Sequence, residues 1–166
     1  MSQVEVAQDA QMVLRRALSM FPTGVVALCA QVDGEPVGMA ANSFTSVSLD
    51  PPLVAVCVDK GSRTWPRLAQ SERVGISVLG TQHKAECRQL AQRQGDRFAG
   101  IDWSVTPQQA VFIDDAALWL ECTVRAVFEG GDHEVVLFEV HDAQAFPEVK
   151  PLVFHQSQFR ELISDD

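Results

Sequence analysis

The sequence is short of positive charge. Its 166 residues contain 13 lysines and arginines against 22 acidic residues, which gives a net charge of −9. Nucleic-acid binding relies on clustered cations that neutralise phosphates, and no such cluster occurs along the chain. A nucleic-acid-binding protein is therefore disfavoured, whereas excess negative charge is typical of proteins that stay in solution.

Long apolar runs and paired cysteines are also missing. No run approaches the roughly 18 apolar residues that a membrane span needs, and no basic segment followed by an apolar one opens the chain, so we expect no signal peptide. The four cysteines, Cys29, Cys57, Cys87 and Cys122, are widely spaced, and three lie in apolar, strand-like runs. Buried free thiols in a reducing cytoplasm are favoured over a disulfide framework. We expect a cytoplasmic protein that does not bind membranes.

The common catalytic and cofactor motifs are absent. The chain has no G-x-G-x-x-G, no G-x-x-x-x-G-K and no G-x-S-x-G, which removes the usual dinucleotide, P-loop and serine hydrolase signatures. It also has no H-E-x-x-H and no C-x-x-C. His83 and Cys87 are four residues apart on a predicted helix, but two ligands without a third do not make a metal site, and we expect none.

The patterns that are present predict one mainly β domain with peripheral helices. The chain is 46% hydrophobic, of a length that suits one domain, and we assign it as a single domain over 1–166 with a core at about 14–162. Strands and helices do not alternate regularly, so a closed or nearly closed antiparallel barrel fits better than a doubly wound parallel sheet. Helical spacing predicts helices over 7–21, within 61–71 and over 81–93. Alternation and apolar runs predict strands over 24–32, 35–41, 51–59, 73–80, 118–128, 134–146 and 151–155.

The segment "GMAANSFTSVSLDPP", residues 38–52, is unusual for a barrel strand. Small or polar residues occupy nearly every position from Ala40 to Ser46, where a strand that served only the core would carry Val, Ile or Leu. Small side chains at Ala40, Ala41 and Ser43 would let a flat ring approach the main chain. The alternative is a strand that ends in a Ser/Thr-rich turn before two prolines.

Two loops carry further polar groups. The loop "DKGSRTW", residues 59–65, offers Lys60, Ser62, Arg63 and Thr64 beside backbone N–H groups, and together these could hold a phosphate. A solvated loop ahead of a helix is the plainer interpretation. "GGDH", residues 130–133, has good turn chemistry, and its histidine could be incidental to a polar loop.

Six segments together resemble the short-chain flavin reductases, the reductase components of two-component flavin-dependent monooxygenases. They are "FPTGV" at 21–25, "PVGMAANSFTSVSLDPPLV" at 36–54, "DKGSRTW", "DRFAGIDW" at 96–103, "GGDH" and "KPLVFHQSQF" at 150–159. The resemblance runs from about Leu14 to Leu162. It implies an FMN-binding split barrel, usually a homodimer, in which NADH or NADPH reduces FMN or FAD. The partner is then a separate monooxygenase, reached by diffusing reduced flavin.

The resemblance also implies which residues form the site. Asn42, Ser43, Phe44, Thr45 and Ser46 would line the isoalloxazine and ribityl chain, and Ser48 would lie toward the phosphate. His133 corresponds to the histidine that positions the nicotinamide. The remaining cofactor-binding residues implied are Met39, Ala40, Lys60, Ser62, Arg63, Thr64, Phe98 and Phe159. Hydride transfer needs stacked rings at close distance rather than an acid–base pair, which agrees with the absence of a catalytic dyad.

The sequence departs from the family at one motif. Many relatives carry an aromatic-Tyr-Arg-Gly run near the C-terminus, where this chain has Phe154, His155, Gln156 and Ser157. The missing arginine leaves the choice between NADH and NADPH open, and the choice between FMN and FAD is open as well. Two other functions keep the flavin seat: a flavin carrier or sensor without turnover, and a reductase that passes electrons from bound flavin to a corrinoid or ferric acceptor.

Overall fold

The computed structural model describes residues 3–165, without the side chains of residues 4–6. Its helices are α1 (Gln3–Leu18), α2 (Trp65–Leu68) and α3 (Lys84–Leu90), and a 3-10 turn, η1 (Thr81–His83), precedes α3. Its strands are β1 (Thr23–Gly24), β2 (Val26–Val32), β3 (Glu35–Ala41), β4 (Thr45–Leu49), β5 (Pro52–Asp59), β6 (Val74–Val78), β7 (Trp103–Val105), β8 (Val111–Ile113), β9 (Leu118–Gly130), β10 (His133–Ala145), β11 (Leu152–His155) and β12 (Gln158–Glu161).

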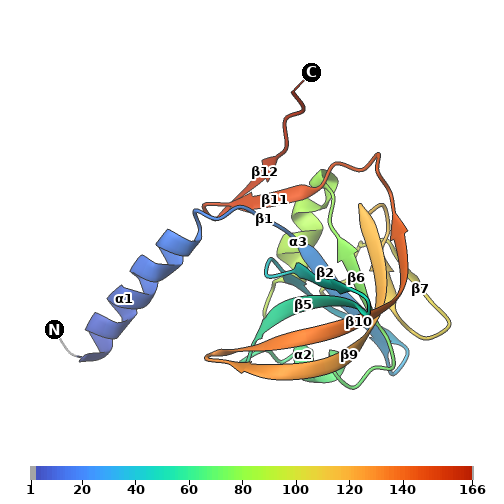
Figure 1. Ribbon diagram of the computed structural model, residues 1–166, viewed down its shortest axis with the longest axis horizontal. Helices are drawn as coiled ribbons and strands as arrows, with labels where there is room; N and C mark the ends of the chain where they lie inside the picture. Colours follow the sequence, from blue (N-terminus) through green and yellow to red (C-terminus); the bar gives the residue numbers. More distant parts are fainter. Residues whose placement is uncertain (1–2, 166) are drawn as a thin grey trace.

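Seven strands form one antiparallel sheet that curls into a barrel (Figure 1). The strand order is β3-β2-β6-β9-β10-β5-β4, so the two edge strands, β3 and β4, are consecutive in the chain. Each pair of neighbours is antiparallel, and three of the pairs, β2-β3, β4-β5 and β9-β10, are consecutive in the chain. Asp33 and Gly34 turn β2 into β3, and both have positive φ, 52° and 82°, which is the backbone of the type I′ hairpin turn.

Two apolar clusters fill the two sides of this sheet. The first lies inside the barrel and includes Phe138, Leu28 and Ile76, none of which is exposed to solvent. The second lies outside, where α3, β8 and β11 cover β2; it includes Leu79, Leu90 and Leu152. Because residues alternate between the faces of a strand, neighbours on β2 and β3 serve different clusters.

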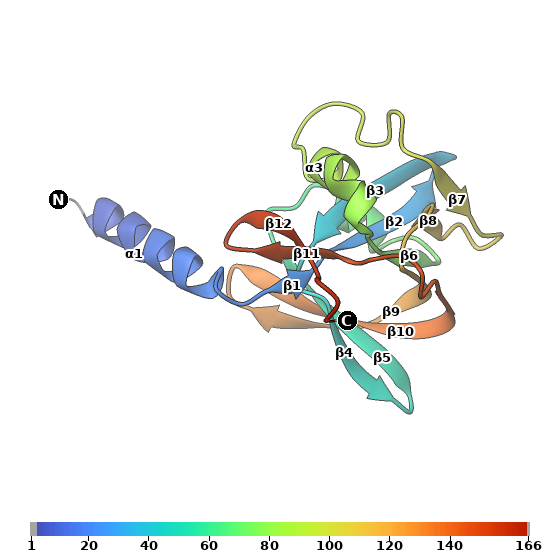
Figure 2. The ribbon, with the colours of Figure 1, turned by 90° about the horizontal axis from the view of Figure 1, so that it is seen from above.

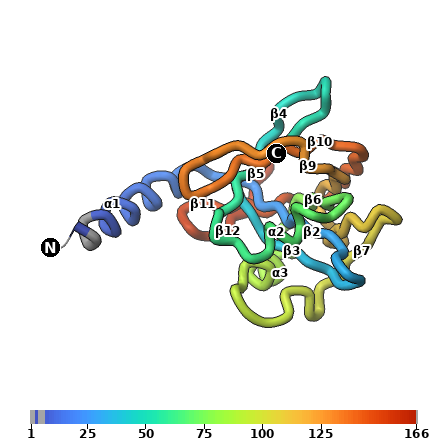
Figure 3. Tube along the Cα trace, turned by 90° about the horizontal axis from the view of Figure 1, so that it is seen from below, coloured from blue at the N-terminus to red at the C-terminus, as the bar shows by residue number. Residues whose placement is uncertain are grey.

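Smaller sheets lie around the barrel. β1, β11 and β12 form a three-stranded sheet, and β7 pairs with β8. The hairpin of β4 and β5 extends away from the body in Figure 2, and α1 projects from it in Figures 1 and 3. Leu14 and Leu18 of α1 are 58% and 66% exposed. Within residues 3–165, no helix combines the length and the apolarity needed to cross a bilayer.

The structure corrects several boundaries predicted from the sequence. The first helix covers Gln3–Leu18 rather than 7–21, and the helix predicted over 81–93 is a 3-10 turn followed by α3, which ends at Leu90. β7 and β12 are not among the predicted strands. The residues from Thr45 to Leu49 form a strand, β4, instead of ending one.

Candidate flavin site

Ser43 fastens the end of β3 to β5. Its Oγ accepts a hydrogen bond from the Cys57 N–H at 3.0 Å and donates one to the Cys57 carbonyl at 2.8 Å. Asn42 before it is exposed, and Phe44 after it packs against the barrel core. Three consecutive residues therefore have different roles: Asn42 is exposed to solvent, Ser43 binds β5, and Phe44 packs against the core.

The loop after β5 begins beside Ser43. The Gly61 N–H donates to Asp59 Oδ1 at 2.6 Å and the Trp65 N–H to Ser62 Oγ at 3.1 Å, so the chain turns tightly into α2. Among residues 3–165, nothing accepts a hydrogen bond from the backbone N–H of Arg63 or Thr64. The loop thus offers free amides and a hydroxyl beside the Arg63 guanidinium.

Arg97 joins this loop to β3. Its Nη1 donates to the Gly38 carbonyl at 3.1 Å and to Thr64 Oγ1 at 2.8 Å. Met39 also contacts the loop, since its Sδ lies 4.0 Å from Ser62 Oγ. A cavity of about 630 Å³ opens at this junction. Its lining residues are Asp59, Gly61, Ser62, Arg63, Arg93, Gln94 and Arg97.

A second cavity, of about 660 Å³, lies between the end of β3, α3 and the hairpin of β11 and β12. Ala40 and Asn42 line it from the strand, and Phe154 and Phe159 line it from the hairpin, with their ring centroids 5.7 Å apart. Arg88 of α3 lies over Phe159, 5.0 Å from the ring centroid. The segment that follows α3 contributes to both cavities, since Ala91 lines this one and Arg93 and Gln94 line the other.

His133 stands at the same end of β5 as the loop. It pairs with Asp59 in the ladder of β10 and β5, and the Lys60 N–H donates to the Asp132 carbonyl at 3.0 Å. Its imidazole is half-exposed, and the Nδ1 of His133 is hydrogen-bonded to the Oδ1 of Asp132 at 2.7 Å. That hydrogen bond, with the charge of the imidazole, lowers the pKa of the Asp132 carboxyl.

Other residues implied by the resemblance lie farther away or are already engaged. Ser46 pairs with Val54 and Ser48 with Leu53, which places Ser48 six residues along β5 from Asp59, roughly 20 Å at the rise of a strand. Thr45 is exposed and pairs with Ala55. Lys60 Nζ is bound to Glu129 at 2.5 Å.

Phe98 lies behind β3 rather than facing a cavity. It is 8% exposed, belongs to the outer cluster, and meets Trp103 edge to face at 6.4 Å. A Cβ added at Gly38 would lie 2.9 Å from the Phe98 ring. Phe98 therefore supports β3, the end of which lines the second cavity.

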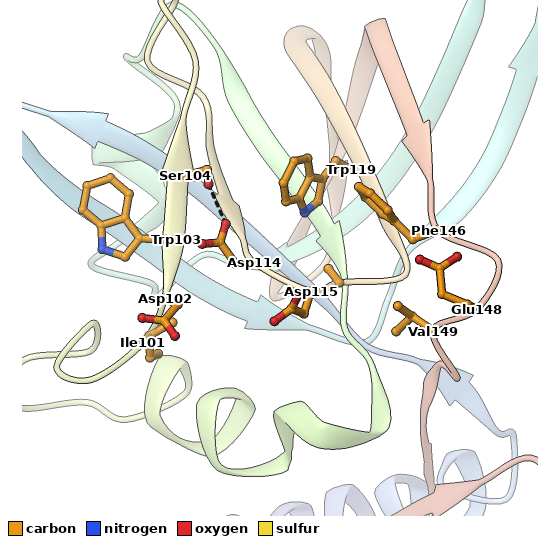
Figure 4. Close-up of a pocket in the computed structure, with 11 residues that line it drawn as sticks. Ile101, Asp102, Trp103, Ser104, Asp114, Asp115, Trp119, Phe146, Glu148 and Val149 are labelled. Carbon is orange, nitrogen blue, oxygen red and sulfur yellow. Dashed lines mark hydrogen bonds between the residues drawn. The ribbon is translucent and has the colours of Figure 1, made fainter.

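A third cavity, of about 550 Å³, has the opposite charge (Figure 4). Asp102, Asp114, Asp115 and Glu148 line it together with Trp119, and none of the residues implied by the resemblance does. Carboxylates repel a phosphate, so this cavity does not suit a phosphorylated cofactor.

His83 and the cysteines have structural surroundings. His83 is 5% exposed; its Nδ1 accepts the Gly80 N–H at 3.0 Å, which leaves Nε2 to donate to the Asp114 carbonyl at 3.0 Å. All four cysteines are free thiols. Burial raises the pKa of Cys29 and Cys87, and that of Cys122 to about 12, so these thiols are poor nucleophiles.

Sequence reasoning missed the arginines of α3 and of the segment that follows it. Arg93 and Arg97 line the cavity at the 59–64 loop, and Arg88 lines the cavity opposite. Two arginines and a glycine in the run "RQGDR" at 93–97 are a weak signal for an anion site. The run can be assigned to an anion site only because the fold places Arg93 and Arg97 in one cavity with Ser62.

Comparison with known proteins identifies the same family that the sequence resembles, over nearly the whole chain. The family model described as a flavin reductase like domain matches residues 18–162. The reductase subunit of a flavin-dependent monooxygenase from Rhodococcus jostii is 35% identical over 145 residues, which are 87% of this chain and 74% of that protein.

Solved structures agree. Nitrilotriacetate monooxygenase component B from Mycobacterium thermoresistibile is 36% identical, with a TM-score of 0.90 over 95% of this chain and 89% of its own. The NADH:FAD oxidoreductase of Streptomyces globisporus, in complex with NAD and FAD fragments, is 38% identical, with a TM-score of 0.88 over 93% of this chain and 94% of its own. The mainly β split barrel with peripheral helices predicted from the sequence is confirmed.

Proposed function

Since this chain belongs to the family of flavin reductase-like domains, we propose that it is a NAD(P)H:flavin oxidoreductase. It takes a hydride from NADH or NADPH, reduces FMN or FAD, and supplies the reduced flavin to a separate flavin-dependent monooxygenase. The observation that carries this function is a pair of cavities: one at the end of β3, lined in part by Ala40, Phe154 and Phe159, and one at the 59–64 loop, lined by Arg63, Arg93 and Arg97.

The residues present fit a phosphorylated flavin. Among residues 3–165, the backbone N–H groups of Arg63 and Thr64 have no acceptor and the Arg63 guanidinium has no ion-pair partner; together with the Ser62 hydroxyl, these are the donors that a phosphate needs. Ala40 and Asn42 leave room for a flat ring beside Phe154 and Phe159. When bound, the flavin supplies an electron acceptor that takes a hydride at its ring N5.

The chain's own residues bind and orient the reactants. Ser43 holds the end of β3 to β5, which fixes the wall that the ring would lie against. Arg97 holds the phosphate loop to the same strand. His133 positions the nicotinamide at the end of β5. Such positioning is the main catalytic contribution to a transfer between stacked rings.

The test is the absorbance of NADH and NADPH at 340 nm, with purified protein and with FMN, FAD or no flavin. We expect rapid loss of absorbance only when flavin is added. Flavin binding without turnover would instead identify a carrier or sensor. Flavin retained through gel filtration would favour a reductase that passes electrons from bound flavin to a corrinoid or ferric acceptor.

Replacing His133 with alanine should weaken NADH use more than flavin use. Loss of one hydrogen bond, worth about 1 kcal/mol, should raise the KM for NADH about fivefold and leave the KM for flavin within twofold. His141→Ala is the matched control, because His141 lies on the same strand and bonds Thr123 instead. If the KM for flavin rises more than the KM for NADH, His133 does not position the nicotinamide.

We also propose that the protein is a homodimer. α1 is 16 residues long, and an isolated helix of about 15 residues is only marginally stable in water. Leu14 and Leu18 lie one turn apart on it and are exposed, as is Leu49, 94% exposed, at the tip of the β4 hairpin. A second copy that covers these side chains would stabilise α1 through apolar burial.

Placing charges on this face of α1 should break the dimer. The double variant Leu14→Glu/Leu18→Glu should reduce the mass measured by light scattering from twice the chain mass of 18.2 kDa to a single chain mass. Arg16→Glu on the opposite face changes the net charge by the same two units and should leave the dimer intact. A wild-type protein that is monomeric at micromolar concentration would contradict the proposal.

Three further expectations belong with this function. We place the protein in the cytoplasm, where its four free thiols are the normal state. Its partner is a monooxygenase component that receives reduced flavin by diffusion. The chain acts as a single domain over residues 1–166, with its core at about 14–162.

A further inference from the structure

The third cavity is a groove with aromatic walls and a negative charge. It measures about 550 Å³, and the rings of Trp103, Trp119 and Phe146 line it. In the view of Figure 4, the carboxylates of Asp114 and Asp115 lie between Trp103 and the other two rings. No residue that lines this cavity lines either of the other two. The groove is therefore separate from the candidate flavin site.

The aromatic wall is fixed by its own packing. Trp119 stacks on Phe112, with ring centroids 5.0 Å apart and an angle of 10° between the planes, and it meets Phe146 edge to face at 5.1 Å. The Trp119 Nε1–H donates to the Ile113 carbonyl at 2.8 Å, so the polar atom of the indole is already satisfied. The ring is half-buried, and what it offers a ligand is its π surface. Such a surface attracts a guanidinium or ammonium group.

The segment that carries Asp114 and Asp115 is held in place as well. The Asp114 N–H donates to the Asp102 carbonyl at 3.0 Å, and Ser104 Oγ donates to Asp114 Oδ1 at 2.6 Å. Gln82 Nε2 donates to the Asp115 carbonyl at 2.7 Å. The groove thus has its shape before any ligand arrives, which lowers the entropic cost of binding.

Nothing in the described chain neutralises the charge of the groove. Four carboxylates line it, and its lining contains no lysine, arginine or histidine; the carboxylates are those of Asp102, Asp114, Asp115 and Glu148. Within residues 3–165, none of the four forms an ion pair. No group of three acidic, histidine or cysteine side chains in that range is placed to hold one metal ion. The charge is spread along the groove and suits an extended ligand with several positive groups.

From the rings and the unpaired charge, we infer that this groove is a docking site for a basic segment of a partner protein, which places an arginine side chain against the rings. Charge complementarity selects the occupant, and a planar guanidinium both stacks on aromatic rings and pairs with a carboxylate through two N–H groups. Because one guanidinium uses one or two carboxylates, four carboxylates match a segment with at least two basic residues. Aromatic pockets that receive arginine are typical hot spots of protein interfaces.

The experiment titrates the full-length protein with a tetra-arginine peptide, acetylated and amidated so that only its side chains are charged. Binding is followed by tryptophan fluorescence, because two of the three tryptophans, Trp103 and Trp119, line the groove. The double variant Asp115→Asn/Glu148→Gln should raise the Kd about tenfold through the loss of two charges. Asparagine suits the φ of 60° at position 115, so the turn should be kept. A tetra-lysine peptide should bind at least threefold more weakly, because an ammonium group is not planar.

The matched control is Asp33→Asn/Glu72→Gln. It removes the same two charges from exposed residues outside the groove, and position 33 also has a positive φ, 52°. The Kd of this control should stay within twofold of wild type. Turnover of NADH with added flavin should be the same in both double variants, because the groove shares no residue with the flavin site.

Several outcomes would overturn the inference. Absence of peptide binding to wild type would refute the docking site, and equal losses in the two double variants would show attraction by net charge alone. Equal affinity for the two peptides would show that the rings take no part. If the groove variant halves the mass measured by light scattering, the occupant is a second copy and not a separate protein. A wild type that binds the peptide but does not oxidise NADH would refute the proposed function and leave the docking site standing.

Discussion

Replacing Gly75 with alanine is expected to destabilise the fold by about 3 kcal/mol, the upper end of the usual cost of overpacking. Gly75 lies in β6 at the centre of the sheet, paired with Cys29 on one side and Glu121 on the other. An added Cβ would overlap the Val111 carbonyl oxygen and come within 3.0 Å of the Phe112 ring. Both obstacles are held in β8, and one of them is backbone, which cannot rotate away.

The effect should be visible as a fall in the unfolding free energy by urea titration, and as a fall in Tm of roughly 10 °C for a chain of this length. Gly24→Ala is the matched control, because an added Cβ there meets no atom within 4 Å, and its effect should stay within about 0.5 kcal/mol. Equal stability of the two variants would show that β8 does not lie against β6.

The position of β8 also matters to the site. Val111 and Ile113 belong to the outer cluster, which contains Phe98, and Phe98 supports β3 at Gly38. Gly75→Ala should therefore weaken flavin binding even in molecules that remain folded. A core substitution and a site substitution are not independent in this protein, because β3, which lines the cavity beside Phe154 and Phe159, is supported from behind by core residues.

The elements with the clearest periodicity could be predicted from the sequence. Alternation over 118–128 and 134–146 corresponds to the long hairpin of β9 and β10, and Asp33-Gly34 marks the turn between β2 and β3. These signals are local, since each strand shows its own pattern and each turn its own residues. Together they are enough for the fold class.

Short elements could not be predicted, because their turns lack a local signal. Gln156 and Ser157 connect β11 to β12 with φ of 52° and 59°, a conformation that favours glycine, asparagine or aspartate. Nothing in "HQSQ" indicates such a turn, so no strand was predicted over Gln158–Glu161. The hairpin forms because Phe154 and Phe159 pack against each other across it.

The candidate site was only half predictable. The 59–64 loop follows a clear strand, so its phosphate chemistry could be expected from Ser62 and Arg63 alone. Arg93 and Arg97 could not be assigned, because their meeting with that loop depends on how the segment after α3 folds back toward β3. Ser48 is close in sequence to Ser43 and was assigned to the site with it, but it pairs with Leu53, at the end of β5 away from the 59–64 loop.

Reversing the charge at Arg63 is expected to reduce flavin affinity on the order of 100-fold. The change removes a charge-assisted bond to phosphate and adds a repelling carboxylate to a cavity that already contains Asp59. Both FMN and FAD should be affected, because each carries the phosphate that the 59–64 loop would hold.

Arg67→Glu is the matched control, because it makes the same change of net charge four residues later, on exposed α2 and outside the cavity. Long-range electrostatics should weaken its flavin affinity by no more than about threefold, and this loss should disappear at high salt. The Arg63→Glu loss should largely persist, because contact between charges in a cavity is less screened than their attraction through solvent. If the two variants lose equal affinity at every salt concentration, the loop acts through net charge alone and Arg63 does not contact the phosphate.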